Sequence, residues 1–443
     1  MLLHLTSLSS GDLGPEAYRF VDFLASAGCT VWQVLPLVPT HESDRSPYNA
    51  LSTMAGNPEL ISAELDAEGD DDGSAYAAWC EAQASWLEPY VEFTALRDLL
   101  DHAPWPTWEA GLRDRDPVRV AEVLADQQPR LEQLRREQWT FAEQWRRLRE
   151  YAAARGVLFF GDLPIFVSHD SADVWASREL FLLDQEGRPT TVTGVPPDYF
   201  AVDGQRWNNP HYDWDRMTRD GFAWWRGRIA RQRELFDLVR IDHFRGFEAA
   251  WHVPVEAATA KDGHWVRNPG HEVLGALVET AGAGTLVAED LGVITAEVDA
   301  LRTDFGLPGM KVLQFAFDGS ADNPYLPARH GEQSVVYTGT HDNDTTRGWW
   351  RAEDEATHRR VRAMLVEPEE AMPWALVRLA LSSTARLVVV PAQDLLGLGA
   401  EARMNTPGTD TGNWAWRAPA GVFDRALATR VHGLVQEAER LPG

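Results

Sequence analysis

Cysteine is scarce: the 443 residues contain two, Cys29 and Cys80, and neither stands in a CxxC or other zinc-ligand spacing. This scarcity excludes a disulfide framework and a cysteine-based zinc module, and it indicates reduced thiols. The N-terminus lacks the basic segment and apolar core of a signal peptide. The chain also lacks any run of about 18 apolar residues, so no membrane-spanning helix is expected. These absences predict a cytoplasmic protein.

Basic residues are also in short supply. The chain has 41 Lys and Arg against 67 Asp and Glu, which gives a net charge of −26. An arginine-rich stretch within residues 132–150 is interleaved with glutamates, a pattern typical of a solvated helix face and not of a phosphate-binding patch. The balance argues against nucleic acid as a partner and favours a neutral or cationic ligand. Adaptation to a salty environment would produce the same excess of acid.

Tryptophan, by contrast, is abundant, with 19 residues. Core packing uses several, but such a number is also typical of a cleft for a large, flat, partly apolar ligand. Sugar rings fit this description, because their C–H faces stack on aromatic rings while their hydroxyls need polar partners. The composition therefore favours a carbohydrate ligand.

Short apolar runs rich in β-branched residues alternate with segments of helical length, which predicts βα units and a parallel sheet. Helices are expected at Pro15–Gly28 and Arg130–Gly156, each ending on a glycine. Eight expected strands predict the α/β class and a (β/α)8 TIM barrel. These strands are Thr30–Leu37, Pro58–Ser62, Val157–Val167, Leu238–Phe244, Thr285–Leu291, Met310–Phe317, Ser334–Thr340 and Arg386–Ala392.

The uneven spacing of these strands predicts one catalytic domain, residues 1–443, with insertions around its active-site face. Residues 63–150, between the second and third expected strands, are acidic and helical in pattern. Residues 187–225, between the third and fourth, are rich in Pro, Gly and Trp and are expected to form an active-site loop. Barrels of this kind extend beyond about 400 residues when they carry insertions.

Four expected strands carry an acid at or near the C-terminal end: Asp162, Asp242, Glu289 and Asp342. In a barrel this end holds the active site, and burying so many carboxylates is costly unless they are paired or used. Retaining glycoside cleavage needs two carboxyl groups about 5–5.5 Å apart. Asp242 and Glu289 are on adjacent expected strands, which lie about 4.8 Å apart. The sequence therefore predicts them as nucleophile and acid.

The neighbours of these acids support the assignment. Arg240 lies two residues before Asp242 and points to the same side of the strand, where its charge would keep Asp242 ionised. Glu289, the longer side chain, can reach the leaving oxygen, and Asp342 can bind sugar hydroxyls. A lone strand-end Asp is nevertheless often a helix cap, and a structural role is expected for Asp290.

Two further alternatives concern single residues. His243 and His341 could be zinc ligands, as in metal-dependent barrel hydrolases, but the usual HxH and HExxH arrangements are missing. Asp162 could be catalytic or could orient a loop, and its spacing favours orientation.

Several motifs, in a fixed order along nearly the whole chain, carry a family resemblance. They are Leu3–Leu8, Trp32–Leu37, Ser46–Tyr48, Ala55–Pro58, Gly161–Ile165, Gly194–Phe200, Gly204–Trp207, the strand-end acids with their neighbours, Gln393–Gly399 and Arg403–Gly408. With these motifs the chain resembles the amylomaltase, or disproportionating-enzyme, family of 4-α-glucanotransferases, which are relatives of the α-amylases.

The resemblance implies an enzyme that transfers α-1,4-glucan segments. The donor is a maltooligosaccharide or a starch or glycogen chain, and the acceptor is the 4-hydroxyl of glucose or another glucan. The implied reaction is a retaining double displacement through a covalent glucosyl-enzyme, without cofactor or metal. The implied partners are maltooligosaccharides and α-1,4-glucans, with no nucleic acid or membrane, for a monomer or homodimer.

The resemblance also implies a role for each matched residue. The nucleophile falls on Asp242, the acid/base on Glu289 and the transition-state-stabilising acid on Asp342. The segment Thr193–Trp214 matches the family's flexible active-site loop, whose aromatic residues are expected to hold the acceptor sugar. Substrate-binding roles fall on Tyr48, Asp162, Trp207, Arg240, His341 and Asn343.

The chain departs from the family pattern at some positions. Asn208 stands where the family usually has glycine, Phe166 stands where tyrosine is common, and the loop Ser7–Gly14 is short. Two rival functions remain: an α-glucan hydrolase, which would use the same three acids, and a catalytically dead glucan-binding protein. A dead copy would be free to lose a carboxylate, whereas this chain has all three.

Overall fold

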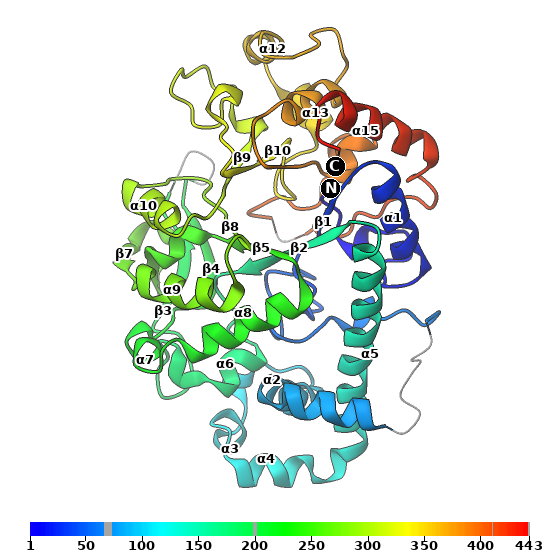
Figure 1. Cartoon of the computed structure of the whole chain (residues 1–443). Helices are drawn as coiled ribbons and strands as arrows, with labels where there is room; N and C mark the ends of the chain where they lie inside the picture. The colour runs from blue at the N-terminus through cyan, green and yellow to red at the C-terminus, as the bar shows by residue number, and fades with distance from the viewer. Residues whose placement is uncertain (66–72, 198–201, 410, 442–443) are drawn as a thin grey trace.

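Parallel strands form the centre of the molecule (Figure 1). The computed structural model describes residues 1–65, 73–197, 202–409 and 411–441. One parallel sheet has the order β1-β2-β5-β8 and a second has the order β11-β10-β9. The strands are β1 (Val31–Gln33), β2 (Leu158–Pro164), β5 (Leu238–Asp242), β8 (Leu286–Ala288), β9 (Gly309–Val312), β10 (Ser334–Tyr337) and β11 (Leu387–Val389).

The two parallel sheets join at both edges into a closed barrel. At one edge the N–H of Ala288, at the end of β8, donates to the carbonyl of Pro308, just before β9, at 2.9 Å. At the other edge Leu2 forms parallel bridges to Gln33 of β1 and to Pro391 after β11. The segment at Leu2 thus fills the eighth strand position, and the predicted (β/α)8 barrel is confirmed.

The predicted strand Pro58–Ser62 is wrong. Pro58–Leu60 is a 3-10 helix, at whose start the Asn57 side chain accepts a hydrogen bond from the Glu59 N–H at 3.0 Å. Pro58 has no N–H to give to a strand ladder, and asparagine is a favoured residue at a helix start. The other seven predicted strands each overlap an observed one.

Helices surround the barrel and fill its connections. The predicted helices Pro15–Gly28 and Arg130–Gly156 are observed as α1 (Pro15–Ser26) and α5 (Gln128–Ala153), each followed by a glycine with φ of 72° that ends the helix. The other α-helices are α2 (Ser74–Leu99), α3 (Ala110–Arg113), α4 (Pro117–Leu124), α6 (Ala172–Ala176), α7 (Trp214–Arg219), α8 (Ala223–Leu235), α9 (Gly270–Ala281), α10 (Ala296–Asp304), α11 (Thr346–Ala352), α12 (Glu355–Arg362), α13 (Trp374–Leu381), α14 (Ala392–Leu395) and α15 (Arg425–Glu437). Within the described ranges, no helix is both long and apolar enough to cross a membrane.

The helices of the predicted insertion, residues 63–150, lie in the lower part of Figure 1. They are α2, α3, α4 and most of α5, and α2 packs against α5. Because the predicted second strand is a 3-10 helix, this segment connects β1 to β2, which are neighbours in the sheet. The assignment of residues 1–443 to one catalytic domain stays a prediction.

A small antiparallel sheet, which the sequence patterns did not predict, stands beside the barrel. Its order is β4-β3-β6-β7. The predicted loop at residues 187–225 contributes two strands to this sheet, and it also contains α7 and the start of α8. Residues 198–201 of that loop, which include Asp198–Phe200 of the matched motif, lie outside the described residues. The four strands are β3 (Thr191–Val195), β4 (Gln205–Pro210), β6 (Ala249–Pro254) and β7 (His264–Arg267).

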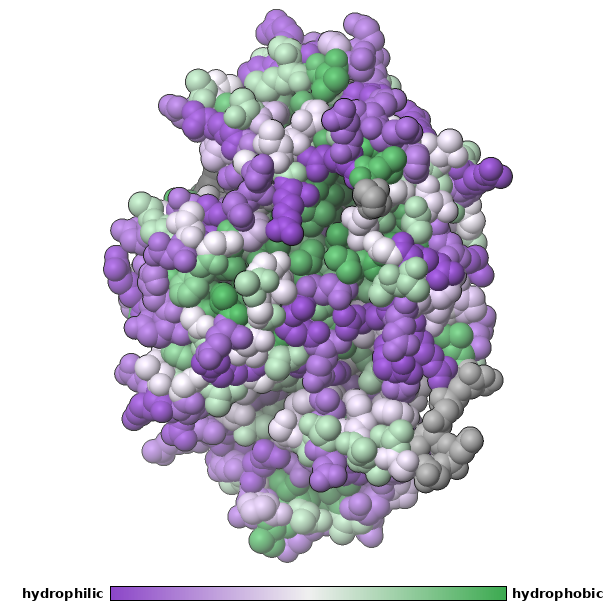
Figure 2. Space-filling model, viewed as in Figure 1, coloured by the Kyte–Doolittle hydropathy of each residue, from purple (hydrophilic) through white to green (hydrophobic). Residues whose placement is uncertain are grey.

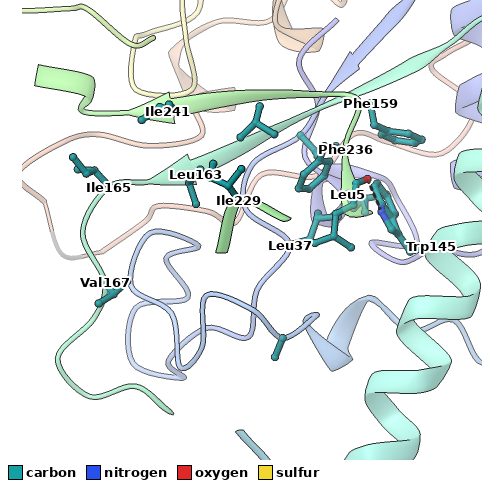
Figure 3. Close-up of a cluster of buried hydrophobic side chains, with 14 of the residues drawn as sticks. Leu5, Leu37, Trp145, Phe159, Leu163, Ile165, Val167, Ile229, Phe236 and Ile241 are labelled. Carbon is teal, nitrogen blue, oxygen red and sulfur yellow. Dashed lines mark hydrogen bonds between the residues drawn. The ribbon is translucent and has the colours of Figure 1, made fainter. Parts of the chain in front are cut away.

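The main core lies between the barrel strands and the helices around them. Phe159 of β2 points outward against Trp145 of α5, with ring centroids 4.5 Å apart, and Phe236 lies on the same cluster (Figure 3). Seven of the 19 tryptophans are buried, so their abundance reflects core packing as well as any cleft. On the face shown in Figure 2, polar side chains cover most of the surface, and apolar ones show in a recess near its centre.

Candidate active site

Strand register determines which side chains meet at the barrel mouth. Asp162 of β2 pairs with Arg240 of β5, and β5 pairs with β8 up to the residues just before Asp242 and Glu289. Alternate residues of a strand point to the same side, so Arg240 and Asp242 share one face. The four residues therefore converge at the C-terminal ends of three neighbouring strands, as the sequence predicts.

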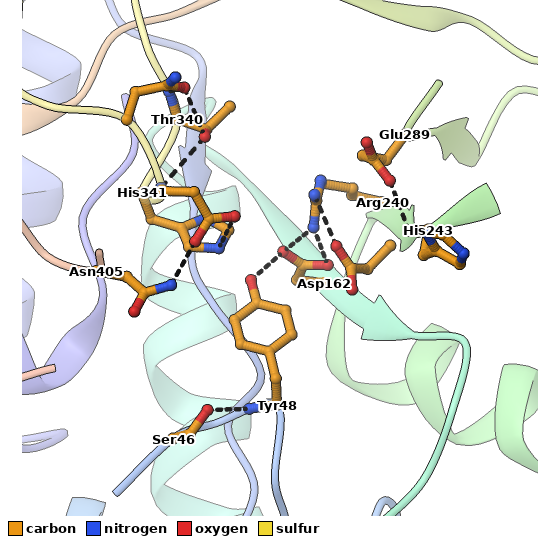
Figure 4. Close-up of polar contacts among 12 residues, drawn as sticks. Ser46, Tyr48, Asp162, Arg240, His243, Glu289, Thr340, His341 and Asn405 are labelled. Atoms are coloured by element: carbon orange, nitrogen blue, oxygen red, sulfur yellow. Dashed lines mark hydrogen bonds and ion pairs between the residues drawn. The ribbon is translucent and has the colours of Figure 1, made fainter. Parts of the chain in front are cut away.

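Arg240 is the cation at the centre of this group (Figure 4). Its Nη1 lies 2.8 and 2.7 Å from the two carboxylate oxygens of Asp162, and its Nη2 lies 2.8 Å from Oδ1 of Asp242. The Tyr48 hydroxyl donates to the same Asp162 carboxylate at 2.8 Å. Arg240 and Asp162 are buried, while 27% of the Asp242 side chain stays exposed. Asp162 thus orients Arg240 and Tyr48, and Asp242 faces the open site.

Glu289 is held by the backbone. The His243 N–H donates to its Oε2 at 2.7 Å, and the Leu291 N–H donates to its Oε1 at 3.0 Å. His243 has a φ of 53°, and this left-handed turn directly after Asp242 brings its N–H toward Glu289. A carboxyl group fixed in this way can exchange a proton with a ligand without moving its own chain.

Asp342 lies on the opposite side of the site, after β10. Its Oδ2 is 3.3 Å from Nε2 of His341, and the Asn405 side-chain amide donates to its Oδ1 at 2.6 Å. Arg403 donates to the Asp342 backbone carbonyl at 2.6 Å. These bonds fix both the backbone and the carboxylate of Asp342.

Asn343, which the resemblance assigns to substrate binding, holds a turn. Its side-chain oxygen accepts hydrogen bonds from the N–H and the hydroxyl of Thr340, at 2.8 and 2.9 Å. This shapes the backbone that carries His341 and Asp342.

Burial dominates the electrostatics of the two central carboxyl groups. It raises the pKa of Asp242 to about 8 and that of Glu289 to about 7, while Arg240 lowers both. Arg240 thus acts in the direction that the sequence predicts, but burial outweighs it. The pair therefore holds a proton near neutral pH. Because a guanidinium bond to a carboxylate is stronger than a peptide N–H bond, we place the negative charge on Asp242 and the proton on Glu289.

Aromatic rings flank the carboxyl groups on both sides. On the Asp342 side, the rings of Tyr48 and His341 are stacked with centroids 5.2 Å apart, and Trp414 lies 5.7 and 5.9 Å from them. On the Glu289 side, Trp207 meets His243 edge-on at 4.8 Å. Apolar ring surfaces beside hydrogen-bonding groups suit a chain of sugar units.

His243 and His341, the candidate zinc ligands, lie on opposite sides of the site (Figure 4). His341 pairs with Asp342, and the His243 ring packs against Trp207. In the ranges that the structure covers, no three or more His, Cys, Asp or Glu side chains are grouped as metal ligands.

Comparison with known proteins agrees with this geometry. The family model described as 4-alpha-glucanotransferase matches residues 3–73 and 65–422. The chain belongs to the 4-alpha-glucanotransferase family. It is 45% identical to the 4-alpha-glucanotransferase of Thermus thermophilus over 494 aligned positions, which cover 100% of this chain and 98% of that one. It is 40% identical to the chloroplastic/amyloplastic 4-alpha-glucanotransferase DPE1 of Arabidopsis thaliana, and this alignment covers 100% of this chain and 84% of that one. The solved amylomaltase of Streptococcus agalactiae in complex with acarbose has a TM-score of 0.94 at 30% identity and covers 100% of this chain and 99% of its own.

A departure from the 4-alpha-glucanotransferase pattern has a structural explanation. Asn208, where glycine is usual, has a φ of 64°. Only glycine takes this left-handed conformation without cost, and asparagine is among the residues that tolerate it best. Its side chain also accepts a hydrogen bond from Arg206 at 2.8 Å. The backbone next to Trp207 therefore keeps the shape that glycine would allow.

The sequence patterns did not predict that the loop of residues 403–414 contributes to the active site of this 4-alpha-glucanotransferase. Asn405 and Arg403 bond to Asp342, and Trp414 packs on Tyr48. The motif Arg403–Gly408 was part of the family resemblance, but a loop contact between residues more than 60 positions apart leaves no periodic signal. The available hint was a run of hydrogen-bonding residues outside any expected strand or helix.

Asparagine at position 242 is expected to stabilise the free protein at alkaline pH. Burial raises the pKa of both carboxyl groups of the pair, to about 8 for Asp242 and about 7 for Glu289, above the ordinary values of about 3.9 and 4.3. The native pair therefore retains a proton, placed on Glu289 near neutral pH, that the unfolded chain releases, and this contribution to stability is lost as pH rises from about 4 through 8. Asparagine leaves one carboxyl group, so the variant never carries the two adjacent negative charges that the wild type acquires. At pH 8 we expect Asp242→Asn to add about 1 kcal/mol, allowing for solvent screening.

Thermal unfolding followed between pH 5 and 9 measures this effect. The difference in melting temperature between Asp242→Asn and the wild type should increase in favour of the variant as pH rises. Asp262→Asn, which removes an exposed carboxylate, is the control: its melting temperature should change with pH by the same amount as that of the wild type. An equal gap between Asp242→Asn and the wild type at every pH would contradict the assignment.

Proposed function

We propose that this protein transfers α-1,4-glucan segments from a donor maltooligosaccharide or glucan to the 4-hydroxyl of an acceptor glucose or glucan. The observation that carries the proposal is the carboxyl pair at the barrel mouth: Asp242, bonded to Arg240, beside Glu289, which can hold a proton. Their strands are direct neighbours. That spacing matches the short separation of about 5–5.5 Å that retaining glycoside chemistry requires.

In the first step, Asp242 attacks the anomeric carbon and the glycosidic bond breaks. Glu289 gives its proton to the departing oxygen, so a covalent glucosyl-enzyme and a shortened glucan result. Asp342 lies where it can accept hydrogen bonds from hydroxyls of the reacting ring, and these bonds strengthen as the ring distorts toward the transition state. Arg240, His341 and Tyr48 position that ring.

In the second step, Glu289 takes the proton of an acceptor hydroxyl, which attacks the same carbon and releases Asp242. Water in place of the sugar would give hydrolysis. Trp207, edge-on to His243 on the Glu289 side and only partly buried, offers a ring face for the acceptor, and an acceptor sugar bound there takes the place of water. Transfer is therefore favoured over hydrolysis.

The wider setting of the reaction is part of the same proposal. Cys29 and Cys80 are both free thiols, which suits a reducing cytoplasm. The net charge of −26 suits neutral glucans and not nucleic acids. We propose a cytoplasmic enzyme, monomeric or homodimeric, that needs neither metal nor cofactor.

Incubation with maltotriose tests the proposed activity. A transferase should convert it into free glucose and a ladder of longer maltooligosaccharides, resolved by chain length. A hydrolase would yield only shorter sugars. No change with maltotriose or with longer dextrins would leave a glucan-binding protein without activity.

A further inference from the structure

Trp414 has a backbone conformation that a bulky residue rarely adopts. Its φ is 61°, in the left-handed region, where a side chain of this size is an outlier. The loop holds this conformation in place: the Trp414 N–H donates to the Met404 carbonyl at 2.8 Å, and Asn413 accepts from the Thr406 N–H at 2.9 Å. Strain of this kind persists where function needs a side chain in one place.

The conformation brings the Trp414 ring against two residues of the site. It lies beside the stacked rings of Tyr48 and His341, tilted by 39° to each. One part of it packs on the apolar residues of the barrel interior, and the side chain stays only partly buried. Trp414 therefore extends the aromatic wall that begins at Tyr48 and His341.

The position of Glu289 gives this wall a direction. Glu289 and His243 lie on one side of Asp162 and Arg240, and His341 lies on the other (Figure 4). Because Glu289 protonates the departing oxygen, the leaving portion of a glucan lies on the Glu289 side. The portion that stays bound to Asp242 must then extend past His341 toward Trp414.

We propose that Trp414 is a stacking platform for the donor glucan, contacting the glucose unit next to the reacting ring on its non-reducing side. This assignment rests on the proposed function. The C–H face of that unit lies on the indole, while its hydroxyls face the polar residues of the same loop. Trp414 thereby selects donors that retain at least two units on the enzyme after cleavage.

Binding to a form that cannot turn over tests the platform directly. Isothermal titration of Asp242→Asn with maltoheptaose should show binding, and Trp414→Ala in that background should weaken it about tenfold. Trp414→Phe should restore most of the affinity, because a ring is kept. Trp414→Gly, which relieves the positive φ, should weaken binding as alanine does while folding without the backbone strain.

Kinetics separate the donor side from the acceptor side. With maltoheptaose as donor and isotopically labelled glucose as acceptor, Trp414→Ala should lower kcat/KM for the donor about tenfold and leave the KM for glucose unchanged. Trp416→Ala is the matched control: Trp416 lies two residues away and packs on the core, so its loss should lower the melting temperature and spare the donor KM.

The outcomes distinguish the platform from the activity. If Asp242→Asn binds maltoheptaose with the same affinity whether or not Trp414 is also replaced by alanine, the platform is overturned and the proposed transferase activity is unaffected. A raised KM for glucose alone would place Trp414 on the acceptor side and overturn it too. A wild-type protein that neither binds nor converts maltoheptaose would overturn the proposed function itself.

Discussion

Asp242→Asn is expected to lower glucan transfer by about 10,000-fold, because the amide cannot form the covalent glucosyl-enzyme. The fold should survive, since Arg240 keeps its two bonds to Asp162 and asparagine has nearly the same size and shape as the partly exposed aspartate. Product formation from maltotriose, followed over days, measures the loss. The same samples should retain or exceed the wild-type melting temperature.

The stereochemistry of rescue tests the nucleophile more sharply than the loss of rate. In Asp242→Ala, azide can enter the space of the carboxylate and attack an α-glucosyl fluoride directly. One displacement at the anomeric carbon breaks the C–F bond, forms the C–N bond and releases fluoride, so the product is the β-azide. An α-azide, or no rescue together with full transfer activity, would remove Asp242 from the reaction.

A second buried carboxylate provides the control. Asp173, in α6, bonds to the N–H and the hydroxyl of Thr53, both at 2.8 Å, and its pKa is raised by burial. We expect Asp173→Asn to lower the melting temperature and to leave the turnover rate at 25 °C within a few-fold of the wild type. Comparison of the two variants separates loss of a carboxylate from loss of the nucleophile.

The position of the main site residues could be predicted because one rule governs them. Asp162, Arg240, Asp242 and Glu289 all lie at the ends of short β-rich runs, and parallel strands bring such ends to one edge. Strand period then sets which residues face inward. Local pattern therefore sufficed for this half of the site, including the contact between Arg240 and Asp242.

Other parts depended on contacts that no local pattern records. The eighth strand position is filled at Leu2, which bridges to both Gln33 and Pro391, whereas Pro58–Ser62 has a strand-like composition but begins with a proline and a capped turn. The two outer strands of the small antiparallel sheet, β4 and β7, are polar or exposed along much of their length, so their alternation is weak. In each case tertiary contacts, and not the local strand propensity of the residues, decided which segment became a strand.

The energetics of the site were also only partly accessible. The sequence shows that Arg240 stands beside Asp242 but not that burial would outweigh it and raise the pKa of both Asp242 and Glu289. Burial depends on all the loops that close around the barrel mouth. Among these is the loop of Asn405, whose bond to Asp342 joins residues far apart in the chain.

Glu289→Gln is expected to lower transfer from maltotriose by about 100- to 10,000-fold, because a sugar leaving group needs the proton that Glu289 supplies. Glutamine keeps one acceptor oxygen, for the N–H of either His243 or Leu291, and its NH2 group faces the other N–H, so the melting temperature of the variant should fall while the fold is kept. The loss should depend on the leaving group: with an α-maltosyl fluoride donor, fluoride departs without protonation, and formation of the glucosyl-enzyme should stay near the wild-type rate. A burst of fluoride measured by rapid quenching reports that step.

Azide again gives the decisive outcome, now with the opposite stereochemistry. In Glu289→Ala the glucosyl-enzyme forms on Asp242 and waits, because no base activates the acceptor hydroxyl. Azide needs no base, so it should attack the intermediate, release Asp242 and give the α-azide after two inversions, with turnover of the fluoride restored. The pH dependence of the rate should change as well. The wild-type rate falls at alkaline pH because Glu289, with its pKa raised to about 7, loses its proton. Glu289→Ala acting on the fluoride donor should not show this alkaline fall. A β-azide from Glu289→Ala would exchange the two roles and place the nucleophile at position 289.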